Sequence, residues 1–224
     1  AHDPKTDRDI IIEINPRTSR SSALASKATG FPIALVSAML AAGLTLKDIP
    51  CGKYGTLDKY VPDADYVVIK FARWAFEKFK GVEDKLGTQM RAVGEVMSIG
   101  KTYKEAFQKA IRSLETGRYG LGHAKNVDTL GKDELLKMLI TPSSERHFIM
   151  YEALRAGATV EEIHEITKVK HYFIEQMKEL VEEEEALIAN KGSVPCDEAL
   201  TAAKKNGFSD KYLSQILEVP EADI

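Results

Sequence analysis

A short glycine-rich segment divides this chain into two parts of different composition. Residues 116–122 read Thr-Gly-Arg-Tyr-Gly-Leu-Gly, and three glycines in six residues are typical of a linker. Before this segment, β-branched runs typical of strands alternate with helical patterns, whereas beyond it no convincing strand is found. The sequence therefore predicts an α+β region over residues 1–116, followed by an all-α region over residues 117–224.

Hydrophobic periodicity predicts the elements of each region. In the first region, we expect strands at residues 9–14, 66–71 and 92–99, and helices at 22–28, 33–42 and 103–114. In the second region, we expect helices at residues 132–140, 143–156, 159–167, 170–189, 195–206 and 209–217. Ser143 is the expected cap of one helix, and Thr159-x-x-Glu162 is a capping box. Residues 219–224 look like the first turn of another helix, so we expect an internal piece of a longer polypeptide.

The charges of the two regions differ in sign. Residues 117–224 hold 13 basic and 20 acidic residues, a net charge of −7, while residues 1–116 have a net charge of +4. Because duplex binding relies on neutralising phosphates, the acidic region predicts no nucleic-acid partner, although its short helices resemble helix-turn-helix pairs. No apolar run approaches about 18 residues, which predicts no membrane span. We expect a cytoplasmic protein, or one of an organellar matrix, in which Cys51 and Cys196 are reduced.

Residues 10–16 read Ile-Ile-Ile-Glu-Ile-Asn-Pro, an apolar, β-branched run typical of a buried strand that ends at the proline. Glu13 and Asn15 interrupt this run two positions apart. Alternate residues of a strand share a face, so a carboxylate and an amide oxygen would lie side by side. Such hard oxygen ligands suit Mg²⁺ or Mn²⁺. The alternative is a strand whose polar groups simply pair with their neighbours.

Two arginines and three serines follow this run. Arg17 and Arg20 can hold phosphate or carboxylate oxygens through their guanidinium groups, although ordinary surface cations are the alternative. The serines at positions 19, 21 and 22 are all plausible N-caps for the helix expected from about residue 23. The segment therefore combines candidate metal ligands with candidate anion ligands.

These residues carry a family resemblance. The run Glu13-x-Asn-Pro-Arg-x-Ser-Arg-Ser-Ser-Ala-Leu-Ala-Ser-Lys-Ala-Thr-Gly30 resembles the metal-binding strand and loop of carbamoyl phosphate synthase large chains, in the first of their two ATP-grasp halves. Residues 88–100 match the same half, and a weaker resemblance runs through the helical remainder. The resemblance implies that residues 1–116 are the C-terminal portion of the carboxyphosphate-synthesising ATP-grasp domain. It implies that residues 117–224 are an all-helical oligomerisation domain, truncated at its C-terminus.

The resemblance also implies roles for individual residues. Glu13 and Asn15 would hold the Mg²⁺ or Mn²⁺ ions that bind the ATP phosphates, so Glu13 would contact ATP through the metal. Arg17 and Arg20 would act as catalytic residues that face bicarbonate and carboxyphosphate. Ser21 would contribute an oxygen to a site for a monovalent cation, K⁺. A further family ligand would precede the first residue, so we expect this chain alone to be inactive.

The implied parent is a glutamine-dependent, ATP-dependent carbon–nitrogen ligase of arginine or pyrimidine biosynthesis. It would make carbamoyl phosphate from bicarbonate, glutamine-derived ammonia and two ATP, with a glutaminase small chain as partner. One alternative is a non-catalytic assembly module. Another is a fragment of a different ATP-grasp ligase, such as a biotin carboxylase, but that family lacks the Ser-Arg-Ser-Ser-Ala-Leu-Ala-Ser-Lys run.

The remaining polar and apolar patterns have simpler interpretations. We expect Glu95, in an apolar run, to be salt-bridged or packed, and the four acids at 182–185 to form a solvated face. Apolar stripes on the helices of residues 117–224 predict self-association through this region. The candidate contact residues, each of which could equally be core, are Tyr151, Leu154, Tyr172, Phe173, Tyr212 and Leu213.

Overall fold

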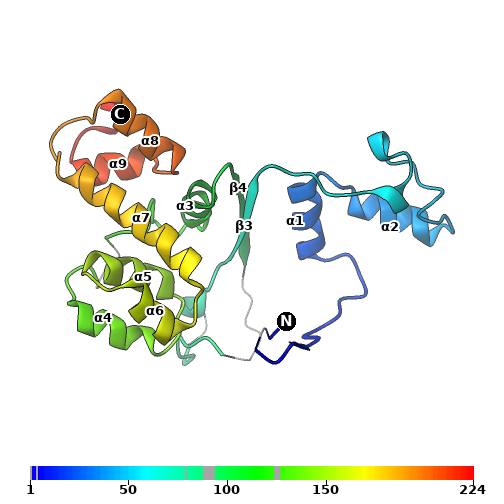
Figure 1. The fold of residues 1–224 in the computed structure, drawn as a ribbon, viewed down its shortest axis with the longest axis horizontal. Coiled ribbons are helices and arrows are strands. Elements are labelled where there is room, and N and C mark those ends of the chain that lie inside the picture. Colours follow the sequence, from blue (N-terminus) through cyan, green and yellow to red (C-terminus); the bar gives the residue numbers. More distant parts are fainter. Residues whose placement is uncertain (1, 4, 79, 88–93, 124–126) are drawn as a thin grey trace. The chain divides into compact units, whose positions relative to one another are not determined.

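The computed structural model describes residues 2–3, 5–78, 80–87, 94–123 and 127–224. The chain forms two compact units, Ala1–Asp65 and Tyr66–Ile224. Its described residues are rich in helix and contain two small antiparallel sheets (Figure 1). The domain boundary predicted between residues 116 and 117 stays a prediction.

The first unit contains two very short strands and two helices. Its elements are β1 (His2–Asp3), β2 (Arg8–Asp9), α1 (Arg20–Thr29), α2 (Ile33–Ala41), η1 (Gly52–Tyr54) and η2 (Leu57–Lys59). The helices predicted at 22–28 and 33–42 are confirmed within two residues at each end. Among the described residues, no single helix is long and apolar enough to cross a membrane; α1 and α2 meet the criterion only together, with a bend of 114° between them.

The buried strand predicted over residues 9–14 is wrong. Residues 10–16 have no regular secondary structure, and Ile11, Ile12 and Ile14 are 79%, 74% and 76% exposed. A strand is stabilised by a paired neighbour and by apolar cover on its faces. Within the described part of this unit, the only strand pairing is the two-residue ladder of β1 and β2, and nothing buries these isoleucines.

The second unit places a β-hairpin and one helix beside a helical bundle. Its elements are β3 (Val67–Ala72), η3 (Phe76–Lys78), β4 (Glu95–Gly100), α3 (Tyr103–Ser113), α4 (Lys132–Leu139), α5 (Arg146–Arg155), α6 (Val160–Thr167), α7 (His171–Ile188), α8 (Asp197–Lys205), α9 (Asp210–Leu217) and η4 (Glu221–Asp223). In the antiparallel hairpin, Val67 lies opposite Gly100 and Ala72 opposite Glu95. Helix α3 packs on both strands, and α7 contacts α3, α5, α6 and α9 (Figure 1).

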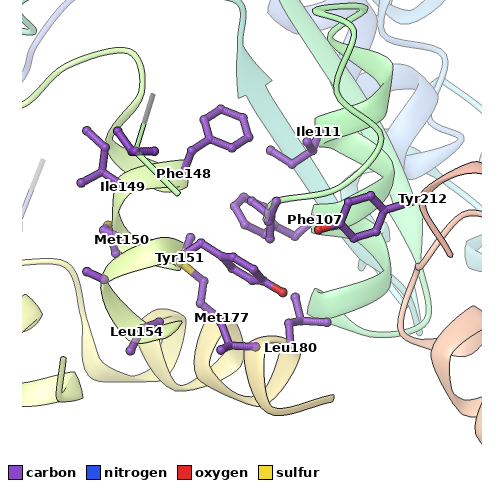
Figure 2. Packing of buried hydrophobic residues seen from close by; sticks show 14 of the residues in the cluster. Phe107, Ile111, Phe148, Ile149, Met150, Tyr151, Leu154, Met177, Leu180 and Tyr212 are labelled. Carbon is purple, nitrogen blue, oxygen red and sulfur yellow. The ribbon is translucent and has the colours of Figure 1, made fainter. Parts of the chain in front are cut away.

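One hydrophobic core joins these elements (Figure 2). It gathers Phe107 and Ile111 from α3, Tyr151 from α5, and Met177 and Leu180 from α7, all of them buried. The apolar stripe predicted for the longest helix therefore does face a core. Beyond residue 116, the described residues contain helices and no strand, as the sequence predicts.

Side-chain caps fix the starts of α1, α3, α6 and α9. The predicted capping box of α6 is confirmed, because Thr159 Oγ1 accepts from the Glu162 amide at 3.1 Å and Glu162 Oε2 accepts from the Thr159 amide at 2.7 Å. The predicted cap at Ser143 is wrong: α5 starts after Glu145, which makes no side-chain cap. Instead, the Asp84 carboxylate accepts from the Ser144 amide at 2.9 Å and hydroxyl at 2.6 Å, just before this helix.

Strand β4 confirms the predicted strand only in part. It begins at Glu95, and residues 92–93 of the predicted strand lie outside the described residues, as do residues 88–93 of the second motif block. The expected salt bridge of Glu95 is confirmed, because its Oε2 lies 2.7 Å from Lys70 Nζ on β3. Cys51 and Cys196 are both free thiols.

Candidate functional site

The segment with the predicted metal and anion ligands leads directly into α1. Ser19 is the N-cap: its hydroxyl accepts from the Ser22 amide at 3.3 Å, and the Ser22 hydroxyl accepts from the Ser19 amide at 3.2 Å. Of the three serines proposed as caps, Ser19 is therefore the N-cap, and Ser22 completes the box. Arg20 and Ser21 are the first two residues of α1, and its first turn contains no acid. The positive end of the helix dipole thus lies beside the two arginines.

Glu13 and Asn15 are exposed in the extended segment before α1. Because this segment is not a strand, the argument that alternate positions share one face does not apply here. Within the described residues, neither side chain makes a hydrogen bond or an ion pair, so their oxygens are available to a hard cation. The described residues hold no group of three or more His, Cys, Asp or Glu side chains that could bind a metal by themselves. The donor set fits Mg²⁺ or Mn²⁺ with ligands from elsewhere.

Arg17 and Arg20 are also exposed. The Arg17 amide donates to the Asn15 carbonyl at 2.8 Å, and this bond forms the turn. The Arg17 side chain makes one long contact, of 3.5 Å, from Nη1 to the Thr18 carbonyl. Within the described residues, neither guanidinium is paired with a carboxylate. The structure thus brings Asn15 and Arg17 together through the backbone and leaves both arginines open to an anion.

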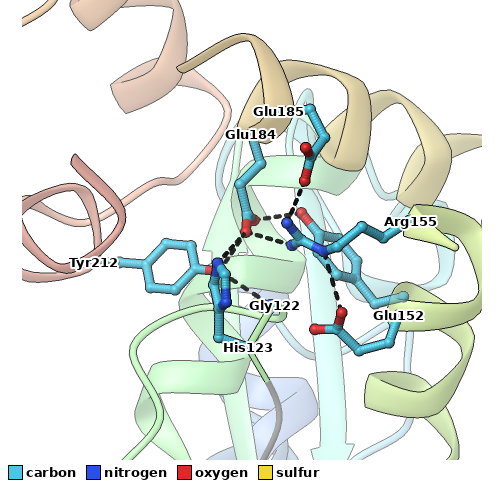
Figure 3. A network of polar contacts seen from close by, with 8 residues as sticks. Gly122, His123, Glu152, Arg155, Glu184, Glu185 and Tyr212 are labelled. Carbon is cyan, nitrogen blue, oxygen red and sulfur yellow. Dashed lines mark hydrogen bonds and ion pairs between the residues drawn. The ribbon is translucent and has the colours of Figure 1, made fainter. Parts of the chain in front are cut away.

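The second unit contains a buried polar network that the sequence reading missed (Figure 3). Its centre is Glu184 of α7, whose side chain is fully buried. Glu184 Oε1 lies 2.5 Å from Arg155 Nη2 and accepts from the Tyr212 hydroxyl at 2.8 Å, while Oε2 accepts from the Tyr151 hydroxyl at 2.7 Å. The network therefore ties α5, α7 and α9 together through one carboxylate.

Arg155 contacts three carboxylates of this network, of which Glu184 is the first. It also pairs with Glu185, and its Nε lies 3.1 Å from Glu152 Oε2. Burial alone would lower the pKa of Arg155, but the adjacent Glu184 carboxylate outweighs it, and the pKa is raised. Burial, and then the charge of Glu184, raises the pKa of Tyr151 well above its ordinary value. Arg155 therefore stays charged and Tyr151 stays neutral at neutral pH.

The four acids at 182–185 do not form a simple solvated face, so that prediction is wrong. A helix turns by 3.6 residues per turn, so one position in such a run faces inward. Glu184 follows Leu180 by four positions and Val181 by three, and it precedes Leu187 by three, on the buried stripe of α7. That spacing was a readable signal, because an acid on an apolar stripe requires a buried partner.

The glycine-rich segment is packed rather than a free linker. A Cβ at Gly120 would lie 2.4 Å from the Tyr212 ring, and one at Gly122 would lie 2.4 Å from Glu184 Oε1. The Gly122 amide donates to the Tyr212 hydroxyl at 3.1 Å. These two glycines are thus explained by close approach to the buried network.

The six candidate contact residues for self-association separate into two groups. Tyr151, Leu154, Tyr212 and Leu213 are buried in the core of the unit, so they are not surface residues. Tyr172 and Phe173 at the start of α7 remain 54% and 40% exposed. Exposed apolar side chains on the second unit thus include this aromatic pair.

Comparison with known proteins gives matches along the chain. Residues 1–49 match the family model described as the carbamoyl-phosphate synthase L chain, ATP binding domain. Residues 95–224 match the model described as the carbamoyl-phosphate synthetase large chain, oligomerisation domain.

Curated relatives match over the whole chain. The carbamoyl phosphate synthase large chains of Thermotoga neapolitana and Archaeoglobus fulgidus are each 47% identical to it, over 100% and 99% of this chain. That of Neisseria meningitidis serogroup B is 48% identical over 100% of this chain. The matches cover 20% of the first relative and 21% of the other two, so the chain spans about a fifth of their length.

Proposed function

This chain belongs to the carbamoyl phosphate synthase large chain family, and from that premise we propose that it is a working section of such a synthase. Residues 1–116 would complete the ATP-grasp domain that phosphorylates bicarbonate, and residues 117–224 would form the helical oligomerisation domain. The observation that carries this proposal is the identity of about 47% along the whole chain, with ATP-binding and oligomerisation matches in that order.

In this proposal, Glu13 and Asn15 hold Mg²⁺ or Mn²⁺ at the ATP phosphates. The metal, when bound, supplies positive charge that neutralises the phosphate oxygens. The exposed carboxylate and amide suit this role because they have no competing partner within the described residues. Ser21, in the first turn of α1, contributes an oxygen to a K⁺ site.

Arg17 and Arg20 bind bicarbonate and the carboxyphosphate that forms from it. When a bicarbonate oxygen attacks the γ-phosphorus, the bond to ADP breaks and negative charge spreads over the transferred oxygens. Positioned cations stabilise that charge more in the transition state than in the ground state. Neither arginine is paired with an acid within the described residues, and the N-terminus of α1 adds positive potential beside them.

The wider reaction is part of the same proposal. Ammonia from glutamine, delivered by a glutaminase small chain, converts carboxyphosphate to carbamate, which a second ATP phosphorylates to carbamoyl phosphate. The synthase works in the cytoplasm or an organellar matrix, for arginine or pyrimidine biosynthesis. The 224-residue chain alone would bind MgATP with no useful affinity, and titration calorimetry that gave a clear saturable heat would overturn this part.

A second candidate is a purely assembling role for the isolated chain. The match of residues 95–224 to an oligomerisation domain favours it. The two roles concern different regions and are compatible within one large chain. Self-association would make the sedimentation coefficient of the 224-residue chain rise with concentration, and a strict monomer at all concentrations would exclude it.

The proposed role of Arg20 in phosphorylating bicarbonate is tested by Arg20→Ala in a full large chain that contains these 224 residues. We expect bicarbonate-dependent ATP hydrolysis to fall by about a hundredfold, since one charge-stabilising group is removed. Arg8→Ala is the matched control, because Arg8 is exposed and makes no ion pair within the described residues. If both variants hydrolysed ATP at the unmodified rate, Arg20 would have no catalytic role.

A further inference from the structure

A cavity of about 600 Å³ lies in the second unit, next to the buried network. It is bounded by the glycine-rich segment, the C-terminal end of α7 and helix α9. Its volume falls within the range of about 300–1,000 Å³ that is usual for small-molecule sites. The lining residues on which the following argument depends are Gly117, Arg118, Gly120, His123, Lys191 and Glu218.

Several backbone N–H groups along this cavity have no hydrogen-bond acceptor within the described residues. The Gly122 amide donates to Tyr212, but the N–H groups of residues 116–121 donate to no acceptor within the described part of the chain. Gly120 and Leu121 are nevertheless buried residues. Because buried backbone N–H groups almost always have a partner, the N–H of Gly120, which lines the cavity, calls for an acceptor that the described residues do not supply.

Three basic residues, Arg118, His123 and Lys191, line the cavity, and Glu218 is the only acid among the described lining residues. Arg118 is also paired with Glu145, which lies outside the lining. Lys191 Nζ lies 2.8 Å from Glu218 Oε1, but both side chains are about half exposed, so the pair is weak and can exchange partners. The Glu184 carboxylate behind the cavity is paired with Arg155, which also contacts Glu152 and Glu185. Among the described lining side chains, basic groups outnumber acids, and this favours a negatively charged ligand.

We propose that this cavity binds a small oxyanion, a carboxylate or a phosphate group. N–H groups of the lining residues 116–120 donate to its oxygens, and Lys191 supplies the countercharge after leaving Glu218. Such a site goes beyond the proposed bicarbonate chemistry, because it lies in the second unit and uses none of the residues of the α1 segment. It gives the helical region a ligand of its own.

The test is an NMR titration of the ¹⁵N-labelled 224-residue chain with inorganic phosphate and, separately, with acetate. We expect saturable shifts of the amide signals of residues 116–120. Lys191→Gln should weaken binding by about tenfold, because one charged hydrogen bond is worth roughly 1.4 kcal/mol. Glu218→Gln should tighten binding, because it removes the acid and releases Lys191. Lys205→Gln, which changes an exposed lysine of α8 away from the cavity lining, should bind as the unmodified chain does.

Each outcome is decisive. Saturation with phosphate alone, with acetate alone or with both supports the proposal and identifies the oxyanion. It is overturned if neither anion gives saturable shifts, if Lys191→Gln binds as tightly as Lys205→Gln, or if Glu218→Gln binds more weakly than the unmodified chain. Because the signals of distant amides report the fold of each variant, lost binding can be separated from lost structure.

Discussion

The two units of this molecule differ in how far their side chains are buried and hydrogen-bonded. In Ala1–Asp65, the isoleucines of residues 10–14 are exposed, and the Glu13 and Asn15 side chains have no partner within the described residues. In Tyr66–Ile224, even a carboxylate, Glu184, is fully buried and bonded to three side chains. The segment of the first unit that carries the family motif is exposed, whereas the second unit buries even charged groups in its core.

The two units differ in the range of the contacts that stabilise their elements. A run such as residues 10–14 becomes a strand only when other strands pair with it, and those contacts are not local. Helices with caps and apolar stripes depend mainly on neighbouring residues and on one shared core. The candidate site of the first unit is therefore indicated by motif and similarity, whereas the fold of the second is explained by its contacts.

The largest expected effect is on the buried network. Arg155→Ala leaves Glu184 buried without its countercharge, which should lower the free energy of unfolding by about 3–5 kcal/mol. Lys178→Ala, which removes only an exposed partner of Glu182, should cost less than about 1 kcal/mol. Urea denaturation of both variants measures the difference. Equal, small losses would show that the network is no more important than a surface pair.

Matched isoleucines test the contrast between the two units directly. Ile163 of α6 is fully buried, so Ile163→Ala should lower the free energy of unfolding by about 2–5 kcal/mol. Ile12 is 74% exposed, so Ile12→Ala should change it by less than about 0.5 kcal/mol in the 224-residue chain. A large loss from Ile12→Ala would mean that residues 10–14 are packed after all.

A buried histidine gives the second unit a pH dependence. His147 packs against Phe71 and Phe107, with ring centroids 4.9 and 5.8 Å apart, and burial lowers its pKa to about 4. Its unfolded pKa is about 6.5, so the unfolded chain binds the proton first and stability falls as pH drops from about 6.5 to about 4. The slope is at most about 1.4 kcal/mol per pH unit.

His147→Gln should flatten the stability profile in that window when unfolding is followed at several pH values. The hydrogen bond from Lys132 lowers the pKa of Glu162 to about 2, so Glu162 acts only below about pH 4.5 and does not obscure most of the window. If the variant kept the slope of the unmodified chain, His147 would not be the group that titrates.

The smallest effect concerns the glycine-rich segment. Gly122→Ala places a methyl group 2.4 Å from two polar atoms of the network, so we expect a loss of about 1–3 kcal/mol in the free energy of unfolding. Gly87→Ala is the control, because a Cβ there would meet no atom of the described residues within 4 Å. If the two variants were equally stable, the segment would be a free linker, as the sequence alone predicts.

The sequence predicted what depends on near neighbours. The helices and the α6 capping box were readable from spacing and flanking residues. For Glu95, only the need for a partner was readable, because Lys70 lies 25 positions away. The burial of Glu184 could have been predicted from its position on the apolar stripe of α7. It was missed because the run of four acids suggested a solvated face. The packing of Gly122 against Tyr212 was not readable, because it joins residues 90 positions apart. The residues of the candidate site were predicted from their motif. Their arrangement in space could not be predicted from the sequence.

The central claim is that the exposed Glu13 of the first unit carries the chemistry of the synthase. Its most direct test is bicarbonate-dependent ATP hydrolysis by a large chain with Glu13→Gln, beside Glu175→Gln, an exposed glutamate of α7 without a partner in the described residues. We predict that Glu13→Gln lowers the rate by more than about a hundredfold with an unchanged circular dichroism spectrum, because the amide keeps the volume and removes the anchoring charge. Glu175→Gln should hydrolyse ATP normally. A near-normal rate for Glu13→Gln would contradict the account.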